Sequence, residues 1–303
     1  MAEWLKAPVL KTDESRGSQG SNPCPSATFD PPAPSRHGLS SIRFRSMCND
    51  PAPAASPEIL YQDEWLLAVN KPAGLLVHPS WIAPAKTPHL VGWVKAQFPG
   101  ETIHTVHRLD RATSGIILFA RDKQTAHNLQ NLFSDRLIEK QYLCVTRGWA
   151  PERGLIDYPL KPIHDKIADK HADPDKEAQE AVSAFERLAT VELPIPVGRY
   201  PQSRYSLVKV CPKTGRKHQI RRHMKHIFHP LVGDTKHGEG RHNRLYREHF
   251  DIHRLLLMAT HLRFTHPVTE QPMTVSAPLD TEVKELFDRF GWRDAIERYF
   301  SGT

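Results

Sequence analysis

The 303-residue sequence contains few cysteines, and no two of them are spaced for a metal or redox site. They form no CxxC pair and lie far apart, at Cys24, Cys48, Cys144 and Cys211. Neither a disulfide framework nor a thiolate zinc site is therefore indicated. Cys144 stands in the strand-like stretch QYLCVTRGW, which predicts a buried structural thiol.

Long apolar runs and common nucleotide or hydrolase motifs are also missing. No run of about 18 apolar residues could span a bilayer, and the N-terminus lacks the apolar core of a secretory signal. We therefore expect a cytoplasmic protein without membrane contact. The motifs GxxxxGK[ST], GxGxxG after a strand, GxSxG and HExxH are absent as well. Nucleotide hydrolysis, hydride transfer and the common hydrolase mechanisms lose support accordingly.

Positive charge is what the chain has in excess. There are 41 Lys and Arg against 34 Asp and Glu, which gives a formal net charge of +7 in addition to 18 His. This balance favours a polyanionic partner, although charge alone is a weak indication of nucleic acid. Hydrophobic residues make up 39% of the chain, enough to bury a core.

The composition divides the chain into two parts. Residues 1–56 are rich in Ser, Pro, Gly and Ala and show no sustained apolar periodicity, so we predict a disordered N-terminal extension. Met47 could serve as an alternative start just before the foldable part. Residues 57–303 are predicted to form one catalytic domain. Within it, the charged segment 160–182 reads as an exposed insertion.

Short strands and scattered helices alternate in the predicted domain. Residues 59–79 read as short strands in hairpins, and IILFA and KQYLCVTRGW as further strands. Helical spacing of apolar residues predicts helices in TPHLVGWVKAQF, DKQTAHNLQNLFSD and TEVKELFDRFGW. No regular strand-helix-strand repeat is apparent, so the pattern indicates an α+β fold.

A basic segment, GRKHQIRRHMKHIFHP, follows a predicted strand and a Thr-Gly turn. On a helix, Ile220, Met224 and Phe228 would share the inward face. The basic side chains would then form a track for phosphates, or an ordinary solvated face. These side chains are Arg216, Lys217, Arg221, Arg222 and Lys225.

Histidines in the same segment raise the alternative of a zinc site. Imidazoles within one or two helical turns can share an ion. The five neighbouring cations would raise the cost of adding Zn²⁺, so we expect no metal. The histidines concerned are His218, His223, His226 and His229.

The stretch HRLDRATSG holds Asp110 between two arginines, just before a predicted buried strand. An acid in this setting is most often a solvated ion pair worth less than about 1 kcal/mol. Ser114 lies near His107 in sequence, but no third group or oxyanion hole supports a Ser-His nucleophile. The residues therefore favour carboxylate chemistry without a cofactor over the other enzymatic readings.

Five motifs in order across about residues 57–275 resemble the RluA family of pseudouridine synthases. They are NKPAGLLVHP, HRLDRATSG, EKQYLCV, TGRKHQIRRH and HLRFTHPVT. LIDYPL, DKIADK and GDTKHG look most like the branch of that family that modifies uridine 65 of tRNA. The resemblance implies a pseudouridine synthase fold, with a mixed, mostly antiparallel central sheet, flanking helices and an RNA-binding cleft.

The same resemblance implies roles for individual residues. Asp110 is expected to be the catalytic nucleophile, paired with Arg221, which would stabilise its charged form. Tyr142 would stack on the target base, and Arg108 would help displace that base from its helix. Lys71 and the proline after it would shape the cleft. Arg216, Lys217, Arg222 and Lys225 of the basic segment would hold RNA phosphates.

The resemblance also implies a tRNA-modifying isomerase that uses neither cofactor nor metal, and we expect it to act as a monomer. No S4-like RNA-binding domain is visible, so target selection would rest with the catalytic domain. Ribosomal RNA is the nearest alternative substrate. A non-catalytic RNA-binding protein and a zinc-dependent hydrolase are the alternatives from other classes. Whether Asp110 attacks the base or the ribose is left open by the residues.

Overall fold

The computed structural model describes residues 56–79, 87–163 and 177–302. The predicted disordered extension, 1–56, lies outside these ranges except for its last residue. Most of the segment 160–182, predicted to be an exposed insertion, lies outside them too.

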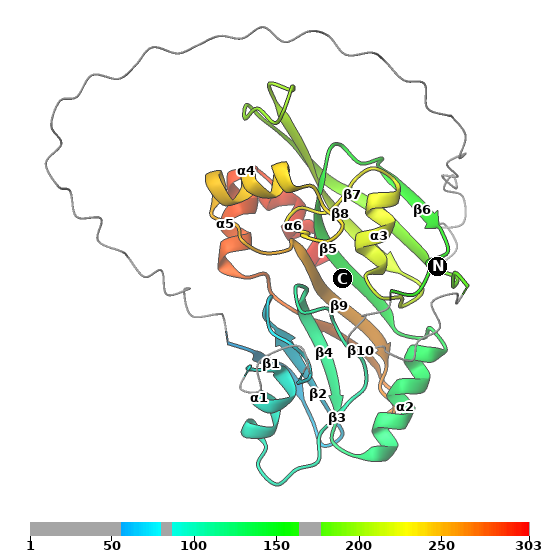
Figure 1. Ribbon diagram of the computed structural model, residues 1–303. Coiled ribbons are helices and arrows are strands. Elements are labelled where there is room, and N and C mark those ends of the chain that lie inside the picture. Colours follow the sequence, from blue (N-terminus) through cyan, green and yellow to red (C-terminus); the bar gives the residue numbers. More distant parts are fainter. Residues whose placement is uncertain (1–55, 80–86, 164–176, 303) are drawn as a thin grey trace, which may run out of the picture. The chain divides into compact units, whose positions relative to one another are not determined.

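In the described residues, ten strands form one mixed sheet (Figure 1). Its order is β1 (Glu58–Gln62), β2 (Leu66–Lys71), β4 (Ser114–Ala120), β9 (Leu257–Thr265), β5 (Glu139–Arg147), β8 (Ser203–Pro212), β7 (Val182–Leu193) and β6 (Arg153–Asp157). Two further strands, β3 (His104–Thr105) and β10 (Pro272–Ser276), pair with β4 and β9. Adjacent strands are antiparallel except β4 and β9, which confirms the predicted mixed, mostly antiparallel α+β fold.

Local sequence explains the first hairpin and the helix that follows β4. Between β1 and β2, the Asp63 carboxylate accepts the backbone N–H groups of Trp65 and Leu66, both at 2.8 Å, which closes the turn. After β4, Asp122 accepts the N–H of Thr125 at 2.8 Å and so caps the next helix. The predicted hairpin and helix are therefore both present.

Helices cover both faces of the sheet. They are α1 (Leu90–Gln97), α2 (Lys123–Ser134), α3 (Gln219–His226), α4 (Gly240–Phe250), α5 (Thr281–Arg289) and α6 (Arg293–Ser301). The three helices predicted around residues 90, 128 and 286 are confirmed. Within the ranges that the structure describes, no helix is long and apolar enough to cross a membrane.

Alternating strand residues feed apolar clusters on opposite faces. In β4, Ile117 and Phe119 pack with α1, whereas Ile116 and Leu118 pack with α2. On the other side of β9, Cys144 of β5 packs with α3. The neighbouring β5 residues join the cluster of α4, α5 and α6 on the opposite face. This period of two is what a sheet buried on both faces requires. Cys144 is fully buried, as predicted.

The basic helix departs from its expected inward face. Ile220 and Met224 are buried as predicted, but Phe228 is 71% exposed. Helix α3 ends at His226, and Phe228 takes a left-handed conformation with φ of 64°, which turns its side chain away from the helical repeat. Arg221, expected among the basic groups, is itself buried and 5% exposed.

Candidate active site

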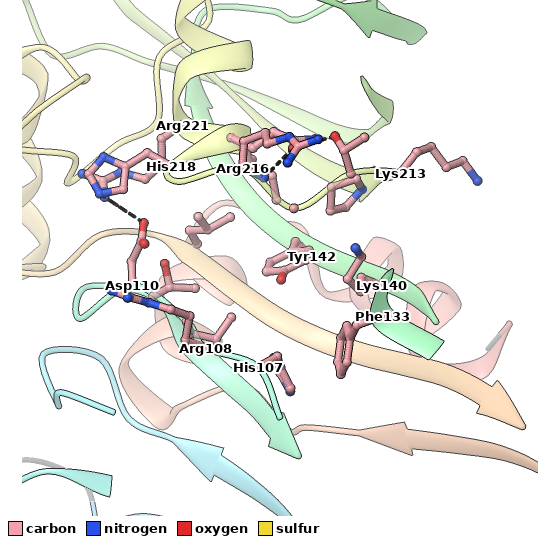
Figure 2. A pocket seen from close by; sticks show the side chains of 18 of the residues that line it. His107, Arg108, Asp110, Phe133, Lys140, Tyr142, Lys213, Arg216, His218 and Arg221 are labelled. Carbon is pink, nitrogen blue, oxygen red and sulfur yellow. Dashed lines mark hydrogen bonds and ion pairs between the residues drawn. The ribbon is translucent and has the colours of Figure 1, made fainter. Parts of the chain in front are cut away.

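A cavity of about 470 Å³ lies on the sheet face that α1 and α3 cover (Figure 2). Its walls come from the segment 107–113, from β5 and the chain before it, and from the segment 212–221. Tyr142 of β5 packs against the clusters of both α1 and α3. The cavity therefore forms where the part of the sheet covered by α1 meets the part covered by α3.

Asp110 lies on the turn that enters β4. The Thr113 N–H donates to the Asp110 carbonyl at 3.1 Å and closes this turn. Two residues later, Gly115 has φ of 113°, and a Cβ there would lie 2.1 Å from the Ala259 carbonyl oxygen. Glycine therefore allows β4 to approach β9 closely just after the turn. The Asp110 side chain remains 24% exposed, on the wall of the cavity.

Arg221 joins two carboxylates. Its Nη1 donates to Asp110 Oδ2 at 3.0 Å, while its Nε and Nη2 donate to the two oxygens of Asp234 at 2.7 and 2.8 Å. The Asp234 side chain is fully buried and also accepts the backbone N–H groups of Lys236 and His237, both at 2.8 Å. Burial would raise the pKa of Asp234, but these hydrogen bonds outweigh it and hold that pKa below its ordinary value. Arg221 is thus fixed in place before any substrate arrives.

His218 lies near the same carboxylate oxygen of Asp110. Its Nε2 is 3.6 Å from Asp110 Oδ2, and its Nδ1 is 2.8 Å from His237 Nε2. Burial lowers the pKa of His218 to about 4, so the ring is neutral at neutral pH. The Arg221 guanidinium, rather than this imidazole, supplies positive charge beside Asp110.

Aromatic rings form another part of the cavity wall. Tyr142, His107 and Phe133 line it, and the last two are in contact with ring centroids 4.4 Å apart. Burial and the negative charge of Asp110 raise the pKa of Tyr142 above its ordinary value, so its hydroxyl remains protonated. A planar base could pack against such a surface.

Arg108 also lines the cavity, with an exposed side chain. In the described parts of the chain, no hydrogen-bond or ion-pair partner is found for its guanidinium. The predicted trio of Asp110, Tyr142 and Arg221 is therefore brought to one cavity together with Arg108.

Lys71 supports the turn of Asp110 through the backbone of Arg111. It is fully buried, and its Nζ donates to the carbonyls of Pro72, Leu75 and Arg111 at 2.9, 3.0 and 3.1 Å. Burial, with the charge of Arg254 adding to it, lowers the pKa of Lys71 to about 7. The predicted Lys-Pro element is thus tied to the backbone of the residue after Asp110.

The basic residues predicted to hold RNA have different surroundings. Arg216 lines the cavity, and its Nε donates to the Glu180 carbonyl at 3.0 Å. Lys217 donates to the Ile163 carbonyl at 3.2 Å and Arg222 to the Lys161 carbonyl at 2.9 Å. Lys225 is exposed on α3.

The histidines of the basic segment 215–230 face different partners rather than one point. His223 contacts the Ser183 hydroxyl and the Tyr158 carbonyl, His226 stacks on the Tyr158 ring, and His229 contacts the Arg147 carbonyl. The residues that the structure describes include no group of three His, Cys, Asp or Glu side chains placed to bind a metal.

The rejected Ser-His pair does not form. Ser114 Oγ accepts a hydrogen bond from Arg254, and His107 Nε2 accepts the Leu118 N–H at 2.9 Å.

Some site residues were missed by sequence reasoning. Asp234 stands in the GDTKHG motif, which was noticed without a role for its acid. Lys140 and Lys213 line the cavity but lie outside the basic segment 215–230. Their only sequence signal was proximity to Tyr142 and to the Thr-Gly turn.

Comparisons with known proteins show the family of this chain. Residues 65–226 match the family described as RNA pseudouridylate synthase. The chain is 51% identical over 239 residues to the tRNA pseudouridine synthase C of Vibrio cholerae, covering 79% of this chain and 98% of that protein. It is 47% identical over 237 residues to the protein of the same name from Haemophilus influenzae, covering 78% and 99%.

Solved structures show the same fold. Human RNA pseudouridylate synthase domain containing 1 superposes with a TM-score of 0.58 at 25% identity, covering 76% of this chain and 86% of that one. Human RNA pseudouridylate synthase domain containing 4 gives 0.57 at 25% identity, covering 77% and 92%.

Proposed function

Because this chain belongs to the RNA pseudouridylate synthase family, we propose that it converts a specific uridine of tRNA to pseudouridine with Asp110 as the nucleophile. The observation that carries the proposal is the ion-pair chain that runs from Asp110 on the cavity wall through Arg221 to the buried Asp234. A partly exposed carboxylate, paired with a guanidinium that is itself held in place, is the group such chemistry needs.

The reaction is an isomerisation, so its atoms balance without a co-reactant. The N1–C1′ bond of uridine breaks, the uracil turns, and a C5–C1′ bond forms. The hydrogen on C5 leaves as a proton, and N1 is protonated. Asp110 forms a covalent adduct with the substrate that is released when the product forms. We propose no metal or cofactor for these steps.

The neighbouring residues are proposed to receive the extruded uridine. A base in a paired or stacked region must leave its helix to reach Asp110, which costs a few kcal/mol. The exposed guanidinium of Arg108 is suited to occupy the vacated place in the RNA. The Tyr142 ring would stack on the uracil, and its protonated hydroxyl could take part in proton transfer.

Transfer RNA is the proposed substrate because relatives at about 50% identity carry the name tRNA pseudouridine synthase C. The excess of Lys and Arg suits a polyanion. Resemblance to the branch that modifies uridine 65 makes that position our specific proposal. We further propose that the enzyme works as a monomer in the cytoplasm.

The proposal is tested by tritium release from tRNA transcripts labelled at uridine C5. We expect release by the wild type, none by Asp110→Ala, and normal release by Asp251→Asn, whose side chain is 95% exposed. Mapping the product should then give position 65. If the wild type released no tritium from unmodified tRNA but did release it from ribosomal RNA, the substrate would be ribosomal RNA instead. Tight RNA binding without release from either would favour a binding protein.

A further inference from the structure

Two lysines line the cavity from neighbouring strands, apart from Asp110. Lys140 precedes Tyr142 by two positions in β5, and both residues line the cavity. Tyr142 pairs with Val210 of β8, and Lys213 follows directly after the end of that strand. Figure 2 shows Lys140 and Lys213 beyond Tyr142 as seen from Asp110.

The charges in this part of the cavity are not balanced. Arg136, which also lines it, is paired with Glu180 at 2.6 Å. Neither Lys140 Nζ nor Lys213 Nζ has a hydrogen-bond acceptor or an acidic partner among the residues described. Burial, followed by the positive charges of Arg136 and Lys213, lowers the pKa of Lys140. A half-buried ammonium without a counter-ion is unfavourable, and an anion bound beside it would remove that cost.

We propose that Lys140 and Lys213 form a binding site for one phosphodiester of the RNA backbone adjacent to the target uridine. The inference rests on the proposed function, because it places that uridine beside Tyr142. A nucleotide there carries a phosphate on each side of its ribose. Each ammonium offers three N–H donors for phosphate oxygens.

This site differs from the phosphate track expected on α3. Lys217 and Arg222 of that segment already donate to the Ile163 and Lys161 carbonyls. Lys140 and Lys213 instead line the cavity with free donors, and Lys140 comes from the same strand as the ring against which the base would stack. They would therefore fix the position of the reacting nucleotide, whereas α3 would contact RNA farther along.

The first test compares Lys140→Gln and Lys213→Gln with Lys123→Gln, an exposed lysine on α2 that does not line the cavity. We expect KM for tRNA to rise about 10-fold in each cavity variant, with kcat nearly unchanged. The slope of log Kd against log salt concentration should decrease by about the amount expected for the loss of one phosphate contact. Lys123→Gln should match the wild type. Because Lys213 is exposed, its variant should fold even if Lys140→Gln is destabilised.

A second measurement identifies the ligand as a phosphate. Short T-arm RNAs are prepared with one neutral methylphosphonate at each position flanking the target uridine, and their binding to Asp110→Ala is measured. At one of these positions, the methylphosphonate should weaken binding to Asp110→Ala. The same methylphosphonate should cause no further loss of binding when the protein also carries Lys140→Gln. Additive losses at all positions, or an unchanged salt slope, would overturn the phosphate site. The binding assay needs no turnover, whereas absence of tritium release by the wild type would refute the proposed function instead.

Discussion

Arg221 and Asp234 are joined by two parallel hydrogen bonds, Nε to Oδ2 at 2.7 Å and Nη2 to Oδ1 at 2.8 Å. This pairing uses one edge of the guanidinium and leaves Nη1 directed at Asp110, 3.0 Å away. A lysine could not replace Arg221 here, because an ammonium lacks the planar fork. We therefore propose that Asp234 is a positioning residue, which acts on Asp110 through Arg221.

Asp234→Asn should lower kcat by about 10- to 100-fold while leaving KM for tRNA close to that of the wild type. The amide cannot accept both Arg221 donors and the backbone N–H groups in the same way, so the guanidinium would lose its fixed direction. The buried charge left without its partner should also cost about 3 kcal/mol of unfolding free energy. Steady-state kinetics and urea unfolding would measure these effects, with Asp251→Asn as control. An unchanged kcat would contradict the positioning role.

Gly115→Ala should destabilise the protein by more than 2 kcal/mol, roughly, because the new Cβ would collide with the Ala259 backbone as well as strain φ. Gly74→Ala is the matched control, since Gly74 has φ of 83° but no atom within 4 Å of the added Cβ. The loss of unfolding free energy in Gly74→Ala therefore measures backbone strain alone, which should be about 1 kcal/mol. Equal losses in the two variants would show that the close approach of β4 to β9 adds no cost.

Acid should destabilise the fold through its buried histidines. Burial lowers the pKa of His107 to about 3 and those of His218, His223 and His261 to about 4. Between these values and about 6.5, the unfolded chain binds more protons than the native protein, so unfolding free energy falls as pH decreases through this range. His107→Gln should reduce the slope of unfolding free energy against pH between 3 and 6.5. His253→Gln, at an exposed position, should leave it unchanged.

Tyr142→Leu should raise KM about 10-fold, because stacking of a base on an aromatic ring contributes about 1–3 kcal/mol. Tyr142→Phe keeps the ring and should retain KM, so any fall in its kcat would report on the hydroxyl. Titration of binding with a T-arm RNA would separate the two effects. If the leucine variant bound as tightly as the wild type, the base would have to pack elsewhere in the cavity.

Local patterns predicted much of the fold. Residues close together in the chain account for the hairpin of β1 and β2, the helices α1 and α2, and the apolar strand β4. Examples are the turn residue Asp63, the helix cap Asp122 and the apolar run IILFA. The parallel contact of Ser114 and Gly115 with β9 could not be predicted in this way, because it joins residues more than 140 positions apart. The exposure of Phe228 was missed because the helix ends two residues earlier than its apolar spacing suggested.

The candidate site was likewise predicted only in part. Motif resemblance identified Asp110, Tyr142 and Arg221, and the structure brings all three to one cavity. Asp234 was missed because its role depends on a buried contact with Arg221, thirteen positions away, that no periodic pattern encodes. Lys140 and Lys213 became site residues only through the pairing of β5 with β8.

The central position of β9 has a consequence for the way the chain is made. Leu257–Thr265 leaves the ribosome long after β4 and β5, yet it lies between them in the finished sheet. Until it arrives, the edge of β4 that faces β9 is paired only with β3, at Phe119 and Ala120, and β5 lacks its β9 neighbour. Incompletely paired strand edges are the kind of surface on which nascent chains aggregate. Pairings of such long sequence separation also form slowly. We therefore expect the nascent chain to need protection from aggregation until it is nearly complete. Shortened chains ending before residue 257 would lack the strand that joins β4 to β5 in the sheet.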